Sequence, residues 1–300
     1  VAPPVTTTPA GQVLPLAGRP AAALFDTATS SLVMFSPGAD PQASGVLTLL
    51  GASGATRQIP LPGPATAVAG DGQGSVFAST RGGYVTADLA AGTARRVAID
   101  GETDTDFTAI ARRADGRLVL GSADGAAYTL DSATTVARKT KIFARVDAIA
   151  TVGDTAVVLD RGQTSVTALD SEGKPQQSLR AGEGATTIAA DPLGRVLVAD
   201  TRADQLLVFG VDPLIERQAY PVPQAPYGLA GSRSLAWVSQ TAANIVVGYD
   251  LATGIPVEKV RYPTVQQPNS LAFDDSSGTL YVVSGSGAGV QVIRDAAGAR

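Results

Sequence analysis

The feature that most constrains the fold of this chain is an internal repeat of about 40 residues that occurs seven times. Residues 269–284 (NSLAFDDSSGTLYVVS) align without a gap on residues 21–36 (AAALFDTATSSLVMFS). In both segments an apolar run is followed by a turn and a second apolar run. The same element recurs from Thr66, Thr108, Asp147, Thr186 and Tyr227. A period of this length, with four short strands in each copy, is typical of the blades of a β-propeller.

The spacing of the copies fits one blade each. The apolar residues at the middle of the first runs are separated by 45, 42, 39, 39, 41 and 42 residues; they are Ala23, Val68, Ile110, Ile149, Ile188, Leu229 and Leu271. Two further short apolar runs follow in each copy, as expected of strands buried between neighbouring sheets. A fourth run is more polar, and its Pro60 and Pro221 are tolerated at a sheet edge. We therefore predict an all-β, seven-bladed β-propeller with four antiparallel strands per blade.

The last copy lacks a fourth strand, because only seven residues follow Val290–Ile293. Residues 14–18 (LPLAG) repeat the pattern of residues 59–63 (IPLPG) at the same distance from the next blade. We expect residues 12–16 to complete the last blade and to close the ring, which removes an open sheet edge. The predicted domains are a flexible Pro/Thr-rich tether over residues 1–11, one propeller over residues 12–294 and a C-terminal tail over residues 295–300.

Composition excludes several classes of function. The chain has no histidine and no cysteine. This removes the side chain that titrates near neutral pH, two common zinc ligands and the thiol nucleophile. The net charge of -4 is spread along the chain and offers no cationic face for nucleic acid. No apolar run reaches the roughly 20 residues of a membrane span. We expect no catalytic residue, no metal, no cofactor and no nucleic-acid partner.

The opening segment and the ratio of arginine to lysine indicate the cellular location and the kind of source organism. Residues 1–10 (VAPPVTTTPA) resemble the tether that follows a removed signal peptide or a lipid-bearing cysteine, and export is favoured over a chain trimmed at an arbitrary position. Arginine outnumbers lysine 19 to 4, as in proteins of high-GC bacteria such as actinobacteria. We expect an exported protein at the extracytoplasmic face of the membrane or in a periplasm-like space, with a lipid tether upstream of residue 1 left open.

Three segments carry a resemblance to known repeat propellers: PYGLA (residues 226–230), ADPLGRVLVAD (190–200) and PNSLAFDDSSGTLYVVS (268–284). They resemble the YVTN and NHL repeats, whose blades begin with proline-x-glycine-aliphatic-alanine and continue into an aspartate-glycine turn. The resemblance covers residues 12–294 and implies a propeller of a kind found in binding scaffolds, surface-layer proteins and a minority of enzymes. With its tether, the chain is similar to exported actinobacterial propeller lipoproteins.

Candidate binding residues gather in two sets of loops. In a propeller, the loops that lead into the first strands and those that join the second and third strands surround one mouth of the central channel. The polar residues that the repeat places there are Arg81, Asp147, Asp160, Arg161, Asp200, Arg202, Tyr227, Gln240 and Asn269, with Asp124 and Arg145 beside them. We expect a ligand or partner to bind on this channel face.

Two interpretations of these loops stay open. Asp160 and Asp200 can cap tight turns by accepting hydrogen bonds from backbone N–H groups. Arg161 and Arg202, on adjacent blades, can instead form a fork for a carboxylate or phosphate.

Residues 100–106 (DGETDTD) could attract calcium, but Ala109 stands where a calcium loop needs glycine, so a solvated acidic loop is favoured.

The enzyme templates associated with propellers fit this chain poorly. Streptogramin-lyase-like propellers rely on histidine, and quinoprotein propellers need several tryptophans where this chain has only Trp237. Lactonase-like propellers hold calcium partly with asparagine, and of Asn244 and Asn269 only Asn269 is expected near the channel mouth. The four lysines fall on outer strands or turns, away from any serine that would need a base. We predict a non-catalytic binding or scaffold module of the bacterial cell envelope that recognises a protein or a small envelope ligand; the alternative is a calcium-assisted hydrolase or lactonase-like enzyme.

Overall fold

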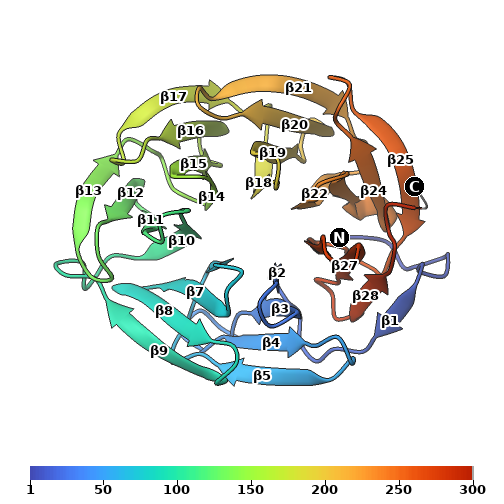
Figure 1. Cartoon of the computed structure of the whole chain (residues 1–300), viewed down its shortest axis with the longest axis horizontal. Coiled ribbons are helices and arrows are strands. Elements are labelled where there is room, and N and C mark those ends of the chain that lie inside the picture. The colour runs from blue at the N-terminus through green and yellow to red at the C-terminus, as the bar shows by residue number, and fades with distance from the viewer. Residues whose placement is uncertain (299–300) are drawn as a thin grey trace. The chain divides into compact units, whose positions relative to one another are not determined.

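A computed structural model describes residues 1–298, and nearly all regular structure in them is β (Figure 1). Six of the sheets are antiparallel meanders of four consecutive strands: β2-β3-β4-β5, β6-β7-β8-β9, β10-β11-β12-β13, β14-β15-β16-β17, β18-β19-β20-β21 and β22-β23-β24-β25. The seventh has the order β1-β28-β27-β26. Successive four-stranded meanders are the blades of a β-propeller, so the predicted fold class is confirmed.

The strand bounds follow the predicted runs closely. In the first four blades they are β2 Ala22–Asp26, β3 Ser31–Ser36, β4 Val46–Leu50, β5 Thr56–Pro60, β6 Val68–Gly70, β7 Ser75–Thr80, β8 Gly83–Asp88, β9 Thr93–Ala98, β10 Phe107–Arg112, β11 Leu118–Ser122, β12 Ala126–Leu130, β13 Val136–Lys141, β14 Ala148–Val152, β15 Thr155–Asp160, β16 Ser165–Leu169 and β17 Pro175–Arg180. In the others they are β18 Ala185–Ala190, β19 Arg195–Asp200, β20 Gln205–Gly210, β21 Ile215–Pro221, β22 Pro226–Gly231, β23 Ala236–Gln240, β24 Ile245–Asp250, β25 Val257–Pro263, β26 Ser270–Asp274, β27 Thr279–Val283, β28 Val290–Ile293 and β1 Gln12–Leu14, with a 3₁₀ helix η1 at Thr241–Ala243.

Burial explains why the second and third runs of each copy are apolar without alternation. Every residue of β3, β11, β12 and β23 is buried, because both faces of these strands are covered. The fourth strands are mostly exposed, as in β5 and β17. Pro60 and Pro221 end β5 and β21, where an edge strand need not donate a ladder hydrogen bond.

The N-terminal strand completes the last blade, as the sequence predicted. β1 pairs antiparallel with β28, with Gln12 opposite Val292, Val13 opposite Gln291 and Leu14 opposite Val290. Figure 1 shows β1 lying beside β28. The strand is shorter than the expected span of residues 12–16, since only its first three residues pair.

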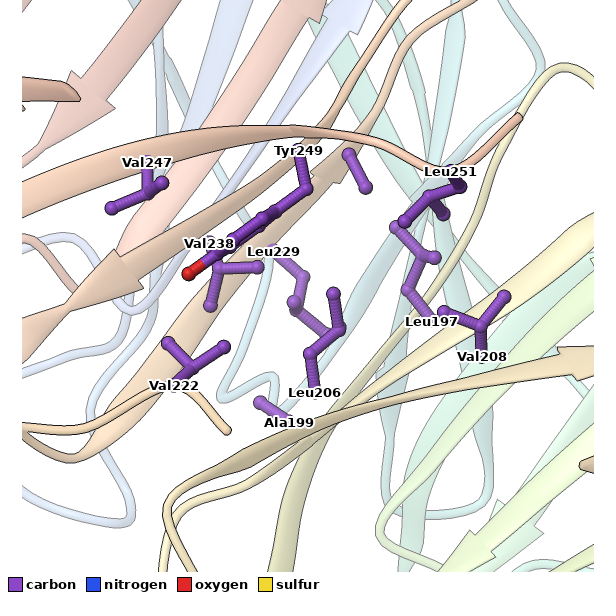
Figure 2. Close-up of a cluster of buried hydrophobic side chains, with 11 residues drawn as sticks. Leu197, Ala199, Leu206, Val208, Val222, Leu229, Val238, Val247, Tyr249 and Leu251 are labelled. Atoms are coloured by element: carbon purple, nitrogen blue, oxygen red, sulfur yellow. The ribbon is translucent and has the colours of Figure 1, made fainter. Parts of the chain in front are cut away.

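Contacts divide the chain into two compact units. We call residues Asp26–Arg180 with Val211–Leu214 the N-terminal unit, and Val1–Phe25, Ala181–Gly210 and the residues from Ile215 onward the C-terminal unit. Each has apolar cores between neighbouring blades. In the N-terminal unit Phe107 and Tyr128 pack edge to face with ring centroids 5.1 Å apart. In the C-terminal unit one core joins strands β19 and β20 to β22, β23 and β24, and Figure 2 shows its side chains, Leu206 and Tyr249 among them.

Residues of the predicted tether and of the predicted tail make specific contacts in the C-terminal unit. The tether predicted as flexible over residues 1–11 is attached at its start, because Ala2 is 4% exposed and hydrogen-bonded, and again at Ala10, whose N–H donates to Pro263. In the predicted tail over residues 295–300, Ala296 is fully buried and its carbonyl accepts a hydrogen bond from Tyr262. Residues 299–300 of that tail lie outside the described residues.

Candidate functional site

The C-terminal unit contains a pocket of about 260 Å3 formed by loops of three blades. Its polar lining comes from Thr201, Tyr227, Thr241, Gln267 and Asn269, and valine and alanine side chains supply the rest. Thr201 and Thr241 follow β19 and β23, Tyr227 is the second residue of β22, and Gln267 and Asn269 lie in the loop before β26. Those are the loop types in which the sequence placed its candidate residues. No side chain that lines the pocket is charged.

Two lining side chains have hydrogen-bonding capacity to spare. Tyr227 is half-buried, and its hydroxyl makes no hydrogen bond within the described residues. The side-chain oxygen of Asn269 accepts from Gln267 Nε2 at 3.0 Å, while the Nδ2 group of Asn269 donates to nothing within residues 1–298. A phenol hydroxyl and an amide N–H beside alanine side chains suit a neutral ligand that carries a hydrogen-bond acceptor and an apolar part.

Gln267 is the centre of the hydrogen-bond network behind the pocket. Its backbone N–H donates to Asn244 Oδ1 at 3.0 Å, and its carbonyl accepts from the N–H groups of Asn269 and Gly285. Both asparagines of the chain therefore meet at this residue. Asn244, which was not expected near the channel mouth, reaches Gln267 from the loop between β23 and β24.

The backbone around the pocket is held in an unfavourable conformation. Gln224, Ala225, Asn244 and Gln267 have φ values of 70°, 56°, 52° and 55°, in the left-handed region. Asparagine tolerates this region, but for alanine and glutamine it costs about 1 kcal/mol or more each. Surrounding contacts fix it: the Ala225 N–H donates to Asp204 Oδ1, and the Ala225 carbonyl accepts from the Thr241 N–H. Backbone strain concentrated at a pocket favours a binding role for it.

The glycine of the PYGLA segment has a steric reason in this site. A Cβ atom on Gly228 would lie 2.8 Å from Ser239 Oγ and 3.0 Å from the Asn269 carbonyl. The loop before β26 thus approaches the backbone of β22 so closely that only glycine fits. The Gly228 N–H also donates to Ser239 Oγ at 2.7 Å, which fixes β22 against β23.

Asp160 and Asp200 are fully buried turn caps, as one of the two sequence-based interpretations held. Asp200 accepts from the N–H groups of Glu183 and Gly184 and from Gln205 Nε2, over 2.8 to 3.0 Å. Burial acts to raise the pKa of Asp200, but these hydrogen bonds and one from the Ala203 N–H outweigh it and hold the pKa below its ordinary value.

Asp160 fulfils the same structural role in its own blade. Its carboxylate accepts from the N–H groups of Ala144, Gly162 and Gln163, over 2.7 to 3.2 Å. These bonds tie the turn after β15 to the loop that leads into β14. A carboxylate with this many internal partners contributes to the loop geometry and is not itself presented to a ligand.

The two arginines of the proposed anion fork are exposed and belong to different units. Arg161 lies in the N-terminal unit and Arg202 in the C-terminal unit. Neither Arg161 nor Arg202 makes a side-chain hydrogen bond or ion pair within the described residues. Gln240 differs from them, because it is 2% exposed and its Oε1 accepts from Arg261 at 2.9 Å. The structure therefore buries Gln240 beside the outer strand β25.

The remaining candidates lie in the N-terminal unit. Asp147 accepts from Arg145 Nε and from the backbone N–H of Arg161, so these three residues form one cluster. Arg81 donates to the Asp104 carbonyl at 2.9 Å and lines a second, open pocket of about 500 Å3 with the acidic residues of the loop over 101–106 and Asp124. No group of three or more acidic side chains within residues 1–298 is arranged to hold a metal ion.

Sequence reasoning missed the pocket residues Thr201, Thr241 and Gln267. It also missed Asn244, which is hydrogen-bonded to Gln267, and Gln266, the neighbour of Gln267. The dipeptide Gln266–Gln267 directly precedes the PNSLAF segment, so its place in a loop that leads into a first strand could have been read from the repeat. Its backbone conformation and its partners could not. No helix in the described part of the chain has the length and apolar character of a membrane span.

No protein-family model and no curated protein sequence matches the chain. Solved structures do match it. A streptogramin B lyase structure has a TM-score of 0.76 at 11% identity and covers 96% of this chain and 97% of the other. U3-55K has a TM-score of 0.77 at 12% identity, with 94% and 97% covered. Likeness at such identity shows the fold alone.

A third match is the virginiamycin B lyase from Staphylococcus aureus, in a catalytically inactive histidine-to-alanine variant with quinupristin. Its TM-score is 0.74 at 10% identity, with 94% of this chain and 97% of the other covered. The seven-bladed propeller is thus confirmed by structure and by structural likeness. The finer resemblance to YVTN and NHL repeats stays an interpretation of the three sequence segments.

Proposed function

We propose that this protein is a non-catalytic binding module of the bacterial cell envelope, which recognises a protein or a small envelope ligand at the pocket of the C-terminal unit. The observation that carries the proposal is the pocket itself: Tyr227 and Asn269 both line a 260 Å3 space whose lining side chains are uncharged, and each has a hydrogen-bonding group without a partner within residues 1–298. Its walls are preformed, because buried hydrogen bonds fix the loops, so little ordering entropy is lost on binding.

The residues in the pocket support binding rather than turnover. Thr201 and Thr241 are its hydroxyl groups besides Tyr227, and each is hydrogen-bonded to a main-chain or hydroxyl group: Thr201 Oγ1 donates to the Pro226 carbonyl at 2.6 Å, and Thr241 Oγ1 bonds Ser239 at 3.1 Å. No imidazole, carboxylate or amine side chain lines the pocket to act as a base. The lyase variant in which one histidine is replaced by alanine is catalytically inactive. This chain contains no histidine.

A site-specific photo-crosslinker tests the proposal. Benzoylphenylalanine at position 227 places the reactive group in the pocket, and the same residue at position 259, on the exposed outer strand β25 of the same unit, is the matched control. We expect one defined adduct from intact envelopes with the first protein and none with the second. Asn269→Ala in the first protein should reduce the yield several-fold, because it removes a side-chain amide from the lining of the pocket.

Two outcomes would contradict the proposal. One is equal crosslinking from positions 227 and 259, which would mean that the outer strands are the contact surface. The other is saturable turnover of ester or lactone substrates by the purified protein, abolished by Asp147→Asn or Asp200→Asn.

A further inference from the structure

The structure contains a second binding feature beside the pocket, formed by three side-chain amides. Gln267 Oε1 accepts from the backbone N–H of Ala2 at 2.7 Å, and Gln266 Nε2 donates to the Ala2 carbonyl at 3.1 Å. Asn244 Nδ2 donates to the carbonyl of Pro3 at 2.8 Å. We call Asn244, Gln266 and Gln267 the amide seat. It forms hydrogen bonds with both main-chain groups of Ala2, the N–H and the carbonyl, and with the carbonyl of Pro3.

The segment held in the seat is attached by little else. Ala2 is 4% exposed, whereas residues 3–8 are exposed and residues 4–9 make no hydrogen bond within the described part of the chain. The next attachment is at Ala10, whose N–H donates to the Pro263 carbonyl. Residues 1–3 therefore occupy the seat like a short bound peptide that is joined to β1 by a segment with few contacts. Figure 1 marks the N-terminal end close to β27.

We propose that the amide seat is a peptide-binding site for the extended main chain of a small residue followed by proline, which a partner protein's segment and the chain's own residues 1–3 occupy in turn. The inference rests on the proposed function, since it names the class of ligand. Recognition through main-chain groups gives affinity with little demand on side chains. Proline after the held residue keeps that residue extended and lowers the entropy lost on binding.

The position of the seat links it to the pocket. Gln267 belongs to both, and Ala2 forms part of the pocket wall. A peptide in the seat thus has its main chain fixed beside the space that Tyr227 and Asn269 line. The chain's own Val1 and Ala2 leave that space open. A partner's segment with the same main-chain contacts can reach into it.

The seat is strained and uncharged, which fits reversible occupation. Asn244 and Gln267 are both in the left-handed region, the Gln267 N–H donates to Asn244 Oδ1, and Gln267 Nε2 donates to Asn269 Oδ1, so two of the three amides are held by bonds that do not involve the peptide. A tethered segment competes at an effective concentration in the millimolar range, which sets the threshold that a partner's segment must exceed.

The test uses the full chain and a labelled probe, acetyl-Val-Ala-Pro-Pro-Val. In the variant Ala2→Pro, residue 2 has no N–H to donate to Gln267 Oε1. The chain's own segment should therefore leave the seat more often. We expect the probe to bind this variant about tenfold more tightly than the unaltered chain, followed through the side-chain amide NMR signals of the seat. A second probe, acetyl-Val-Pro-Pro-Pro-Val, lacks the same N–H and should bind about tenfold more weakly.

A matched pair of charge variants controls for electrostatics. Gln266→Glu replaces the donor to the Ala2 carbonyl by an acceptor of the same shape, and in the Ala2→Pro background it should weaken probe binding about tenfold. Gln163→Glu makes the same change at an exposed turn residue and should have no effect. Melting curves establish that both variants are folded.

A spin label gives an independent measurement. Because the chain has no cysteine, Val5→Cys can be labelled at one site, and Val5 is exposed. We expect the nitroxide to become more mobile when the probe is added, as the chain's own segment is displaced.

Absence of saturable probe binding to the Ala2→Pro variant at millimolar concentration, or equal binding of the two probes, would overturn the inference. If the crosslink from position 227 still forms in that case, the proposed function stands and only the peptide class fails. If neither is observed, both fail.

Discussion

Gln291 donates a hydrogen bond from Nε2 to the main-chain carbonyl of Ala10 across 2.7 Å, and the same nitrogen donates to the Pro263 carbonyl at 3.0 Å. Its Oε1 accepts from the Val265 N–H, and the side chain is fully buried. One amide in β28 thus joins the segment before β1 to the end of β25. We expect Gln291→Leu to lower the free energy of unfolding by about 2 kcal/mol or more, because the buried N–H of Val265 and the partly buried carbonyls of Ala10 and Pro263 each lose a partner. Urea denaturation measures this free energy. An unchanged unfolding midpoint would contradict the prediction and show that water replaces the lost amide.

Completion of the last blade by β1 predicts a difference between two truncations. Removal of residues 1–18 should cost several kcal/mol, because it exposes the edge of β28 and uncovers apolar surface. Removal of residues 1–9 leaves β1 in place and should cost much less, limited to the contacts of Ala2 and Pro3. Equal melting temperatures for the two proteins would contradict the role of β1.

The buried cap Asp200 predicts a pH dependence. Its pKa is lowered in the folded protein, so its contribution to stability is complete above the ordinary aspartate pKa of about 3.9 and is lost as the pH falls through the lower folded value. Asp200→Asn should cost about 1–3 kcal/mol near neutral pH. The difference in stability between the two proteins should shrink in acid, which denaturation at a series of pH values measures. A constant difference from pH 7 to the acid limit would refute the lowered pKa.

Gly228→Ala tests the close approach of the loop before β26. The added Cβ would lie within 3.1 Å of three oxygen atoms, so we expect a loss of about 1–3 kcal/mol and a reduced crosslink from position 227. Gly254→Ala is the steric control, because nothing lies within 4 Å of its Cβ position, although its positive φ adds backbone strain. A fully stable Gly228→Ala protein would show that the loop can move aside.

Partner binding by the exposed residues Arg161 and Arg202 stays a prediction. The double variant Arg161→Ala, Arg202→Ala should weaken binding of the crosslinked partner by roughly 2 kcal/mol and leave the melting temperature nearly unchanged, because neither side chain has an internal partner. Titration calorimetry with the single and double variants measures the effect. Normal binding by the double variant, with crosslinks near Arg95, Lys139 or Lys259, would place the contact on the outer strands.

The sequence alone determined the blades. The apolar centres Ala23, Val68 and Leu271 all fall within first strands, and the LPLAG segment begins with the last residue of β1. These features are visible because each blade is built from local runs and turns, whose periodicity is written in neighbouring residues. The buried caps Asp160 and Asp200 were foreseen for the same reason, since an aspartate at a strand end commonly binds the backbone of the adjoining turn.

Only the tertiary structure decided the site. Ala2 and Gln267 are 265 residues apart in the chain and meet through one hydrogen bond, and no local pattern predicts that contact. Gln240 was predicted on the channel face, but the structure buries it and hydrogen-bonds it to Arg261 of β25, two strands away in the same blade. The left-handed backbone at Ala225 and Gln267 is likewise set by distant partners, against the preference of those residues. Propensity and periodicity act over a few residues, whereas a binding site is made by side chains that the completed fold brings together.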